Sequence, residues 1–366
     1  MKIVCTKENI RRALNYCSKI ISPTTTLPIL GNILLRVDNG QLQISSTNLE
    51  IAIKAWVGGQ IDEQGEITVP GRTLTEYVSS VPDDKITMET SENDLILSTE
   101  KTQSTLKGLA SDEFPLIPQV TANLKFNLPA DVLVKSLSEV VFAASGSETQ
   151  PELSGVLFFF SGEKLRLVAT DRYRLAEKTI LISDVKSEEK KIIVPNRAIS
   201  ELIRIAGDGE GLVEIGFSDN QALFKTEGAE ITTRLIEAQY PDYQQIIPAE
   251  FNTEVKISSQ ELAGTLKLTG LFAAESNNVE MQLSEADGII LTSYSQKAGS
   301  TTSKITTGKV KGENVKILFN HRYLLDCLNH IKQEHVYLKL INSAAPAMIV
   351  PDGDKDYLYL VMPIKT

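Results

Sequence analysis

The chain has 366 residues, of which 42% are apolar, and its 37 basic and 47 acidic side chains give a net charge of −10 at pH 7. No apolar run is long enough to span a bilayer, and the acidic balance taken alone argues against nucleic-acid binding, which usually leaves a basic footprint. Three cysteines without a C-x-x-C pair, and no apolar signal segment after Met1, lead us to expect buried reduced thiols and a cytoplasmic location.

The first third of the chain predicts a strand, a helix, more strands and a second helix. A strand is expected at 1–5, and apolar residues then recur at helical spacing within 10–20. A second helix is expected after the sequence Val69-Pro70-Gly71-Arg72, with its apolar face within 74–81. Short alternating stretches, for example 85–88, are typical of strands.

The same order of elements returns twice. Second helices open at Val194-Pro195-Asn196-Arg197 and at Phe319-Asn320-His321-Arg322, and first helices are expected within 133–144 and 262–269. The helix-start arginines Arg72, Arg197 and Arg322 are separated by 125 residues both times (197 − 72 and 322 − 197). This period is the size of a whole domain and too long for a solenoid repeat. We therefore predict three α+β domains, 1–120, 121–249 and 250–366, each with two helices packed on antiparallel sheets.

The helix-start arginines are unusual because the helix macrodipole disfavours a cation in the first turn by roughly 0.3–1 kcal/mol. Local stability does not explain why the chain places one there three times. Further basic residues are expected on the polar sides of the helices: Arg11, Arg12, Lys19, Lys135, Arg204 and Lys267. A solvated helix face explains any one of these residues, but the threefold recurrence favours a common ligand touched by all three domains.

Short motifs fall between these elements in a fixed order. They are Thr26-Leu27-Pro28-Ile29-Leu30-Gly31-Asn32, Thr47-Asn48-Leu49-Glu50, Val168-Ala169-Thr170-Asp171-Arg172-Tyr173-Arg174-Leu175-Ala176, Tyr240-Pro241-Asp242-Tyr243 and Val361-Met362-Pro363. In this order they closely resemble the bacterial DNA polymerase III beta subunit, the family of replicative sliding clamps. The resemblance covers the whole chain, including its length and its three-domain plan.

The resemblance implies that two such chains close head-to-tail into a ring of six domains, with helices lining a hole for duplex DNA. Such a ring slides as a processivity factor, without catalysis, cofactor or metal. An acidic chain is compatible with this role, because charge is screened beyond a Debye length of about 10 Å and the inner helices supply the local positive charge. The residues expected to face DNA are Arg11, Arg12, Lys19, Arg72, Lys135, Arg197, Arg204, Lys267 and Arg322.

The resemblance also implies a pocket, built by the middle domain and the C-terminal tail, that docks short peptides of the replicative polymerase, the clamp loader and repair proteins. The matching residues are Leu153, Thr170, Arg172, Tyr173, Arg174, Leu175, Pro241, Gln245, Ile246, Val361, Met362 and Pro363. Apolar side chains with a few polar anchors, and a methionine that can repack, suit such a site. The alternative is that Leu175, Ile246 and Val361 are simply core residues.

The chain departs from the family pattern at several positions. Thr24 and the loop 150–152 stand where relatives often carry a basic residue, Gln245 stands where an arginine can occur, and the segment 364–366 lacks the common terminal Arg-Leu. We therefore expect a docking site with altered peptide preference. The residues expected at the ring interface are Leu106 and Lys107 on one end, and Leu271 and Phe272 on the other.

Two other classes of protein are weighed against a clamp. An enzyme is suggested by the polar segment 170–174, or by His321, His330 and His335 as metal ligands. The histidines do not share a helix face, and no P-loop, G-x-S-x-G or Rossmann fingerprint occurs, so we reject catalysis. A scaffold that never touches DNA shares the fold and the peptide site, and only retention on circular DNA distinguishes it from a ring.

Overall fold

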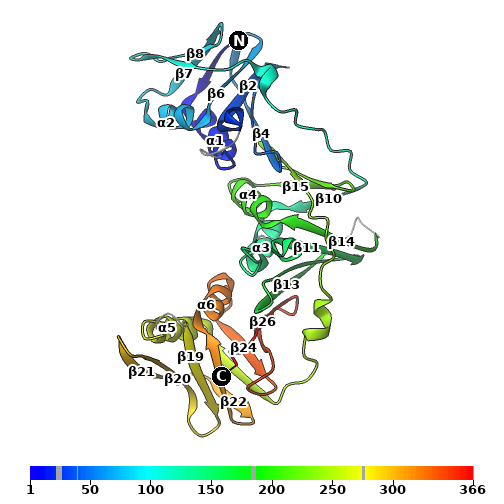
Figure 1. Ribbon diagram of the computed structural model, residues 1–366, viewed down its shortest axis with the longest axis vertical. Helices are drawn as coiled ribbons and strands as arrows, with labels where there is room; N and C mark the ends of the chain where they lie inside the picture. Colours follow the sequence, from blue (N-terminus) through cyan, green and yellow to red (C-terminus); the bar gives the residue numbers. More distant parts are fainter. Residues whose placement is uncertain (22–26, 39, 148, 183–186, 274–276, 366) are drawn as a thin grey trace. The chain divides into compact units, whose positions relative to one another are not determined.

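A computed structural model describes residues 1–21, 27–38, 40–147, 149–182, 187–273 and 277–365 (Figure 1). Thr24, named above as a departure, lies outside the described residues. By its internal contacts the chain forms two compact units. Unit 1 comprises Met1–Val134 and Arg197–Leu235, and unit 2 comprises Lys135–Asn196 and Ile236–Thr366.

Two helices fall in each third of the chain, as predicted. Their bounds are α1 Lys7–Ser18, α2 Gly71–Ser80, α3 Ala130–Val141, α4 Asn196–Gly207, α5 Ser259–Gly270 and α6 His321–His330. The predicted cap at Ser258 is confirmed, since its hydroxyl accepts the N–H of Glu261 at 3.4 Å. Helices α1 and α3 end before the apolar pattern does, because Ile20 and Ala144 lie beyond the helix ends and are nevertheless buried.

Unit 1 contains a five-stranded and an eight-stranded sheet. The first has the order β5 (Gln60–Glu63), β1 (Lys2–Thr6), β7 (Lys85–Ser91), β8 (Asp94–Ser98), β9 (Gln103–Lys107). The second has the order β10 (Leu124–Pro129), β15 (Leu212–Phe217), β16 (Gln221–Lys225), β17 (Ala229–Arg234), β4 (Ile51–Val57), β3 (Gln41–Thr47), β2 (Asn32–Asp38), β6 (Gly65–Pro70). The antiparallel pair β17–β4 joins the first and second repeats in one sheet.

Unit 2 contains a nine-stranded and a four-stranded sheet. The first has the order β14 (Ser187–Pro195), β11 (Gly155–Gly162), β12 (Lys164–Thr170), β13 (Arg174–Leu181), β26 (Tyr357–Val361), β25 (Ala347–Pro351), β24 (His335–Leu340), β18 (Thr253–Ser258), β22 (Lys309–Gly312). The second has the order β21 (Gly299–Ile305), β20 (Gly288–Ser295), β19 (Asn278–Ser284), β23 (Val315–Asn320). Here the antiparallel pair β13–β26 joins the second and third repeats.

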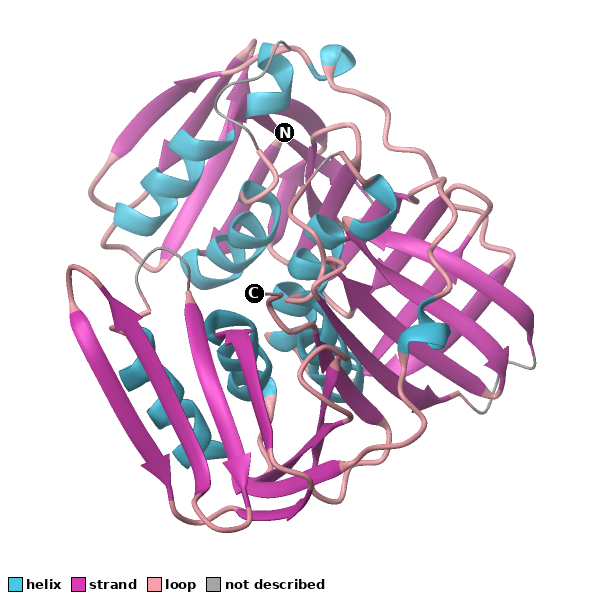
Figure 2. Ribbon diagram, turned by 60° about the horizontal axis from the view of Figure 1, so that its bottom comes forward, coloured by secondary structure: helices cyan, strands magenta, loops and turns pink. Residues whose placement is uncertain are grey.

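Neighbouring repeats are thus merged through their sheets instead of forming separate bodies. Pairing β4 with β17, and β13 with β26, satisfies strand edges that would otherwise be exposed. The helices cover one face of these sheets: α1 packs on α2, β3 and β4, and α5 packs on α6 and the four-stranded sheet (Figure 2). Each unit therefore holds one junction between consecutive repeats.

The three cysteines lie in these cores. Cys5, Cys17 and Cys327 are buried and free of disulfides, as the sequence predicted. Burial raises the pKa of both Cys5 and Cys17 to about 12. No helix in the described part of the chain is long and apolar enough to cross a membrane.

Candidate functional site

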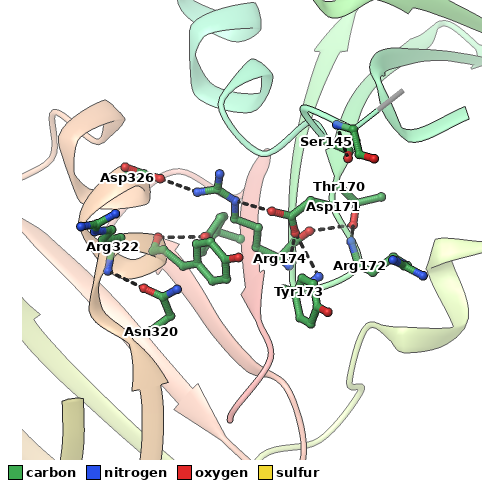
Figure 3. Close-up of polar contacts among 12 residues, drawn as sticks. Ser145, Thr170, Asp171, Arg172, Tyr173, Arg174, Asn320, Arg322 and Asp326 are labelled. Carbon is green, nitrogen blue, oxygen red and sulfur yellow. Dashed lines mark hydrogen bonds and ion pairs between the residues drawn. The ribbon is translucent and has the colours of Figure 1, made fainter. Parts of the chain in front are cut away.

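The segment Thr170–Tyr173 forms a tight turn between β12 and β13 (Figure 3). The Asp171 carboxylate accepts the N–H groups of Tyr173 and Arg174, both at 3.0 Å, and the Thr170 hydroxyl donates to the Arg174 carbonyl at 2.6 Å. Arg172 takes a positive φ of 77°, and its side chain points away from Arg174. Tyr173, at the end of this turn, is 56% exposed.

The first repeat builds the same turn from different residues. Asn48 accepts the N–H groups of Glu50 and Ile51 at 3.1 and 2.8 Å, and Thr47 donates to the Ile51 carbonyl at 3.0 Å. Leu49 has a φ of 76°, nearly that of Arg172. Thr170 and Asp171 thus stabilise a turn, as Thr47 and Asn48 do in the first repeat. This structural role argues against their interpretation as catalytic groups.

The C-terminal tail lies directly beside this turn. Strand β26 pairs with β13 from Arg174↔Val361 onward, and beyond it the Met362 N–H donates to the Tyr173 carbonyl at 2.8 Å. Two residues further on, the Ile364 N–H donates to the Leu318 carbonyl at 2.8 Å. The structure therefore brings together the middle-repeat and tail residues that the sequence assigned to one docking site.

The twelve predicted pocket residues, here called the docking surface, divide into a buried base and an exposed rim. Leu153, Leu175 and Val361 are at most 2% exposed, and Leu175 belongs to an apolar cluster that includes Tyr240 and Tyr243. Leu175 and Val361 are thus core residues, as the alternative held. Ile246 is 47% exposed, so for this residue the alternative is wrong.

The remaining residues of the docking surface are distributed as follows. Thr170 and Pro363 are buried, the Arg174 side chain is only 11% exposed, Met362 is half-buried, and Arg172, Tyr173, Pro241 and Gln245 are exposed. The Gln245 amide donates to Asp242 at 2.7 Å. A cavity of about 470 Å³ lies at the end of the tail and is lined among others by Leu318, Ile364 and Lys365, but by none of the twelve docking-surface residues.

The Arg174 guanidinium contacts two carboxylates and an aromatic ring. Its guanidinium donates to Asp171 at 3.0 Å and to Asp326 at 2.5 Å, and it lies 4.6 Å from the centre of the Tyr323 ring. Burial lowers the pKa of Arg174, but the Asp326 hydrogen bond and nearby negative charges outweigh it, so the pKa is raised. The Tyr323 ring also stacks 6.5 Å from that of Tyr173.

Sequence reasoning missed Tyr323 and Asp326 as members of this site. Asp326 lies on α6 four residues after Arg322, and its side chain turns toward Arg174 (Figure 3). The sequence shows an acidic residue on the expected last helix, but its spacing does not indicate with which cation it pairs.

The helix-start arginines occupy equivalent places. Arg72, Arg197 and Arg322 are each the second residue of their helix, and all three are exposed. Arg72 pairs with Glu76 at 2.8 Å, and Arg197 donates to the Ile20 carbonyl at 3.4 Å. The sequence prediction that these cations lie in the first helical turn is confirmed.

The other cations predicted to face DNA lie mostly on the first helix of each repeat: Arg11 and Arg12 on α1, Lys135 on α3 and Lys267 on α5, whereas Arg204 is on α4 and Lys19 follows the end of α1. Arg11, Arg12, Lys19, Lys135 and Lys267 are exposed. Arg204 is different, because it is half-buried, pairs with Glu201 at 2.5 Å and donates to the Tyr16 carbonyl at 3.0 Å. Arg204 is therefore engaged within unit 1 more fully than the other members of the set.

The residues expected at a ring interface lie near two sheet edges. Leu106 and Lys107 are on β9, the last strand of the five-stranded sheet, where Lys107 pairs with Asp94 at 2.7 Å. Leu271, 72% exposed, and Phe272 follow α5, which packs on β21, an edge strand of the four-stranded sheet. Each edge strand has one free side among the described residues.

Comparison with known proteins covers the chain from end to end. Family models of the N-terminal, central and C-terminal domains of the DNA polymerase III beta subunit match residues 1–118, 127–242 and 244–365. A beta sliding clamp of Staphylococcus aureus is 31% identical over 363 residues, which cover 96% of each chain.

Solved structures agree with the family models. The DNA polymerase sliding clamp of Bacillus subtilis superimposes with a TM-score of 0.95 at 26% identity, covering 100% of this chain and 99% of that one. A sliding clamp of Pseudomonas aeruginosa bound to griselimycin gives a TM-score of 0.95 at 27% identity over 100% of both chains. The predicted fold class, three repeated α+β clamp domains, is thereby confirmed.

Proposed function

Because the chain belongs to the DNA polymerase III beta subunit family, we propose that two copies form a head-to-tail ring that encircles duplex DNA and tethers a replicative polymerase to it. The observation that carries this proposal is the threefold repeat itself: three clamp domains in order, each with an arginine at the second position of its second helix. Three equivalent surfaces suit one extended, repetitive ligand, and the phosphate backbone of DNA is such a ligand.

The contacts with DNA are weak and independent of base sequence. Exposed arginine and lysine side chains on helices make point contacts with phosphates and carry no base readout. Such contacts release counterions and permit sliding. The role is topological, so the chain needs neither catalysis nor a cofactor, and we place it in the cytoplasm with the replicating DNA.

The ring closes through the sheet edges at β9 and β21. An exposed edge is prone to pair with a strand of another chain, and here each edge carries apolar residues beside it, Leu106 on one and Leu271 on the other. A head-to-tail arrangement uses both edges and leaves neither exposed. The two domains that supply the interface are the first and third of the chain.

The mass in solution tests ring closure. Sedimentation at micromolar concentration should give a species near twice 40.2 kDa. Leu271→Asp should reduce it to the single-chain mass, while Leu181→Asp, at an exposed leucine on β13 of the nine-stranded sheet, should not. A wild-type chain that stays monomeric at this concentration contradicts the proposed ring.

The docking surface binds short peptides of the polymerase, the clamp loader and repair proteins. Its exposed Tyr173 and Ile246 and the half-buried Met362 offer apolar contact over a buried base, a usual arrangement for ligand sites. Griselimycin, bound by the Pseudomonas aeruginosa relative, is expected to occupy the same surface here. Griselimycin therefore serves as a defined probe of the docking surface in place of a partner peptide.

A further inference from the structure

Strand β13 carries two nearly buried cations at the ends of its ladder with β26. The ladder runs from Arg174↔Val361 to Lys178↔Tyr357, so the cations stand at its first and last pairs. Their side chains are only 11% and 10% exposed. Because residues four apart in a strand point to the same side, both face the helices.

Each cation is held by an acid from the third repeat. Asp326, on α6, lies 2.5 Å from Arg174, and Asp354, in the turn between β25 and β26, lies 2.6 Å from Lys178. The middle repeat completes each cluster with a second acid, Asp171 for Arg174 and Glu139 for Lys178 at 3.5 Å. Figure 3 shows Arg174 between Asp171 and Asp326. The two clusters thus join the second and third repeats at both ends of the ladder.

The other junction in the chain provides an internal comparison. The β4–β17 ladder also has five pairs, from Ile51↔Thr233 to Ala55↔Ala229. It is flanked by equivalent hydrogen bonds, since the Arg234 N–H donates to the Glu50 carbonyl at 3.0 Å, as Met362 does to Tyr173. Ile51 and Ala55 stand where β13 has Arg174 and Lys178, and both are buried. At these two positions the first junction has no cation, and its ion pair, Lys54 with Glu230 at 3.0 Å, joins the two strands at a pair within the ladder and not at its ends.

Stability does not explain the charges at the second junction. The cost of removing charges from water often equals or exceeds their attraction, so a buried ion pair is commonly no more stabilising than well-packed apolar residues. Hydrogen-bonded ion pairs do fix the distance and orientation of the two elements that carry the charges. What distinguishes this junction from the first is the docking surface, which begins at Tyr173 and Arg174 and ends at the tail that follows β26.

We infer that Asp326 and Asp354 are positioning residues of the docking surface: by holding Arg174 and Lys178 from the third repeat, they fix β13 against β26 and so set the distance between the Tyr173 turn and the tail. The inference rests on the proposed docking function. The geometry of the docking surface then depends on Asp326 and Asp354, which are not among its twelve residues. Burial opposes the ionised form of Asp354, but the hydrogen bond and charge of Lys178 outweigh it, so the pKa of Asp354 is lowered.

The experiment uses the full-length chain and four variants. Asp326→Asn and Asp354→Asn remove one charge each, and Asp326→Glu retains the charge. Asp352→Asn is the matched control, since Asp352 lies in the same turn as Asp354 and pairs with Lys256 at the same 2.6 Å, but does not touch β13. Griselimycin affinity and amide hydrogen exchange over 171–181 and 357–364 are measured for each.

We expect Asp326→Asn to weaken griselimycin binding about ten-fold, by analogy with the loss on removing a partner that orients a metal ligand. Asp326→Glu should recover most of the loss, Asp354→Asn should weaken binding less, and Asp352→Asn should match the wild type. Amide hydrogen exchange over 171–181 should be faster in Asp326→Asn and Asp354→Asn than in the wild type. The amides of β4 and β17, at the other junction, should exchange at wild-type rates.

Two results overturn the inference. One is wild-type affinity in Asp326→Asn, and the other is unchanged exchange over 171–181 in both Asn variants. The exchange measurement needs no ligand, so it decides the inference even if griselimycin fails to bind the wild-type chain. That failure counts against the proposed docking of griselimycin and leaves the positioning role to be judged by exchange alone.

Discussion

At the scale of single residues, the cations of this chain form two populations with different environments. Arg174 and Lys178 are nearly buried and bound by acids, whereas Arg72, Arg197 and Arg322 are exposed at helix starts. Exposed ion pairs contribute little to stability, so the Arg72–Glu76 pair leaves this arginine available to a ligand. The buried set shapes the protein, and the exposed set is the one that can meet a polyanion.

The buried charges predict opposite pH trends for two carboxyl groups. The pKa of Asp354 is lowered by Lys178 against burial, so its stabilising contribution is present above the ordinary aspartate pKa, about 3.9, and is lost as the pH falls through the folded value. Burial raises the pKa of Glu139, so its contribution is fully present at low pH and is lost as the pH rises through the folded value.

Thermal unfolding of two variants between pH 7 and pH 3 checks this prediction. Asp354→Asn should lower the midpoint at pH 7, and its difference from the wild type should shrink toward pH 3. Glu139→Gln should show the reverse trend, with its deficit growing as the pH falls. Parallel trends for the two variants would show that the assigned signs are wrong.

The thiols give a second prediction at this scale. Thiolate is the reactive form, and burial raises the pKa of Cys5 and Cys17 to about 12 and that of Cys327 as well. The native chain should therefore not react with a disulfide reagent at pH 8 within an hour, and all three thiols should react after unfolding. Rapid modification of any one of them in the native chain would contradict the buried assignment.

At the scale of elements, the sequence predicted helices well and junctions poorly. The helix-start motifs located α2, α4 and α6 because apolar spacing and capping are local signals. The pairs β4–β17 and β13–β26 join strands far apart in the chain, and no local pattern specifies such partners. For the same reason the Asp326–Arg174 contact could not be predicted, whereas the docking-surface residues around Tyr173 were found through their motif.

Removing the tail tests the role of an element in docking. Deletion of 362–366 eliminates the Met362 and Ile364 hydrogen bonds to Tyr173 and Leu318, along with the Met362 side chain. Griselimycin binding should be lost while the mass of the assembly stays the same. Deletion of 365–366 alone spares those hydrogen bonds and should leave binding intact. Unchanged affinity in the longer deletion removes the tail from the site.

The helix-start arginines make a second prediction for elements. Replacing Arg72, Arg197 and Arg322 together by Glu should weaken DNA association and lower its salt dependence by about one in log–log slope for each arginine that contacts a phosphate. Replacing the exposed strand residues Lys85, Lys164 and Lys309 by Glu gives the same change in net charge.

That strand variant should bind DNA like the wild type. Equal effects of the two triple variants would mean that net charge alone governs association, and the helices would then have no special part in it. Unaltered circular dichroism in both variants separates either outcome from loss of fold.

At the scale of the whole molecule, an acidic chain is proposed to hold DNA by enclosure. A net charge of −10 opposes tight binding at an open surface, but enclosure needs only enough local positive charge to admit the duplex. Tight phosphate contacts would in fact hinder sliding. The repeat supplies equivalent helices, the sheet edges supply closure, and the docking surface at the second junction supplies the tether for partners.

Retention on circular DNA tests this claim most directly. The chain is loaded on a nicked circular plasmid by its clamp loader, the complex is isolated by gel filtration, and half of it is cut once with a restriction enzyme. The account predicts that the chain stays on the circle and is lost from the linear form by sliding off its ends. Equal retention on circular and linear DNA would contradict it.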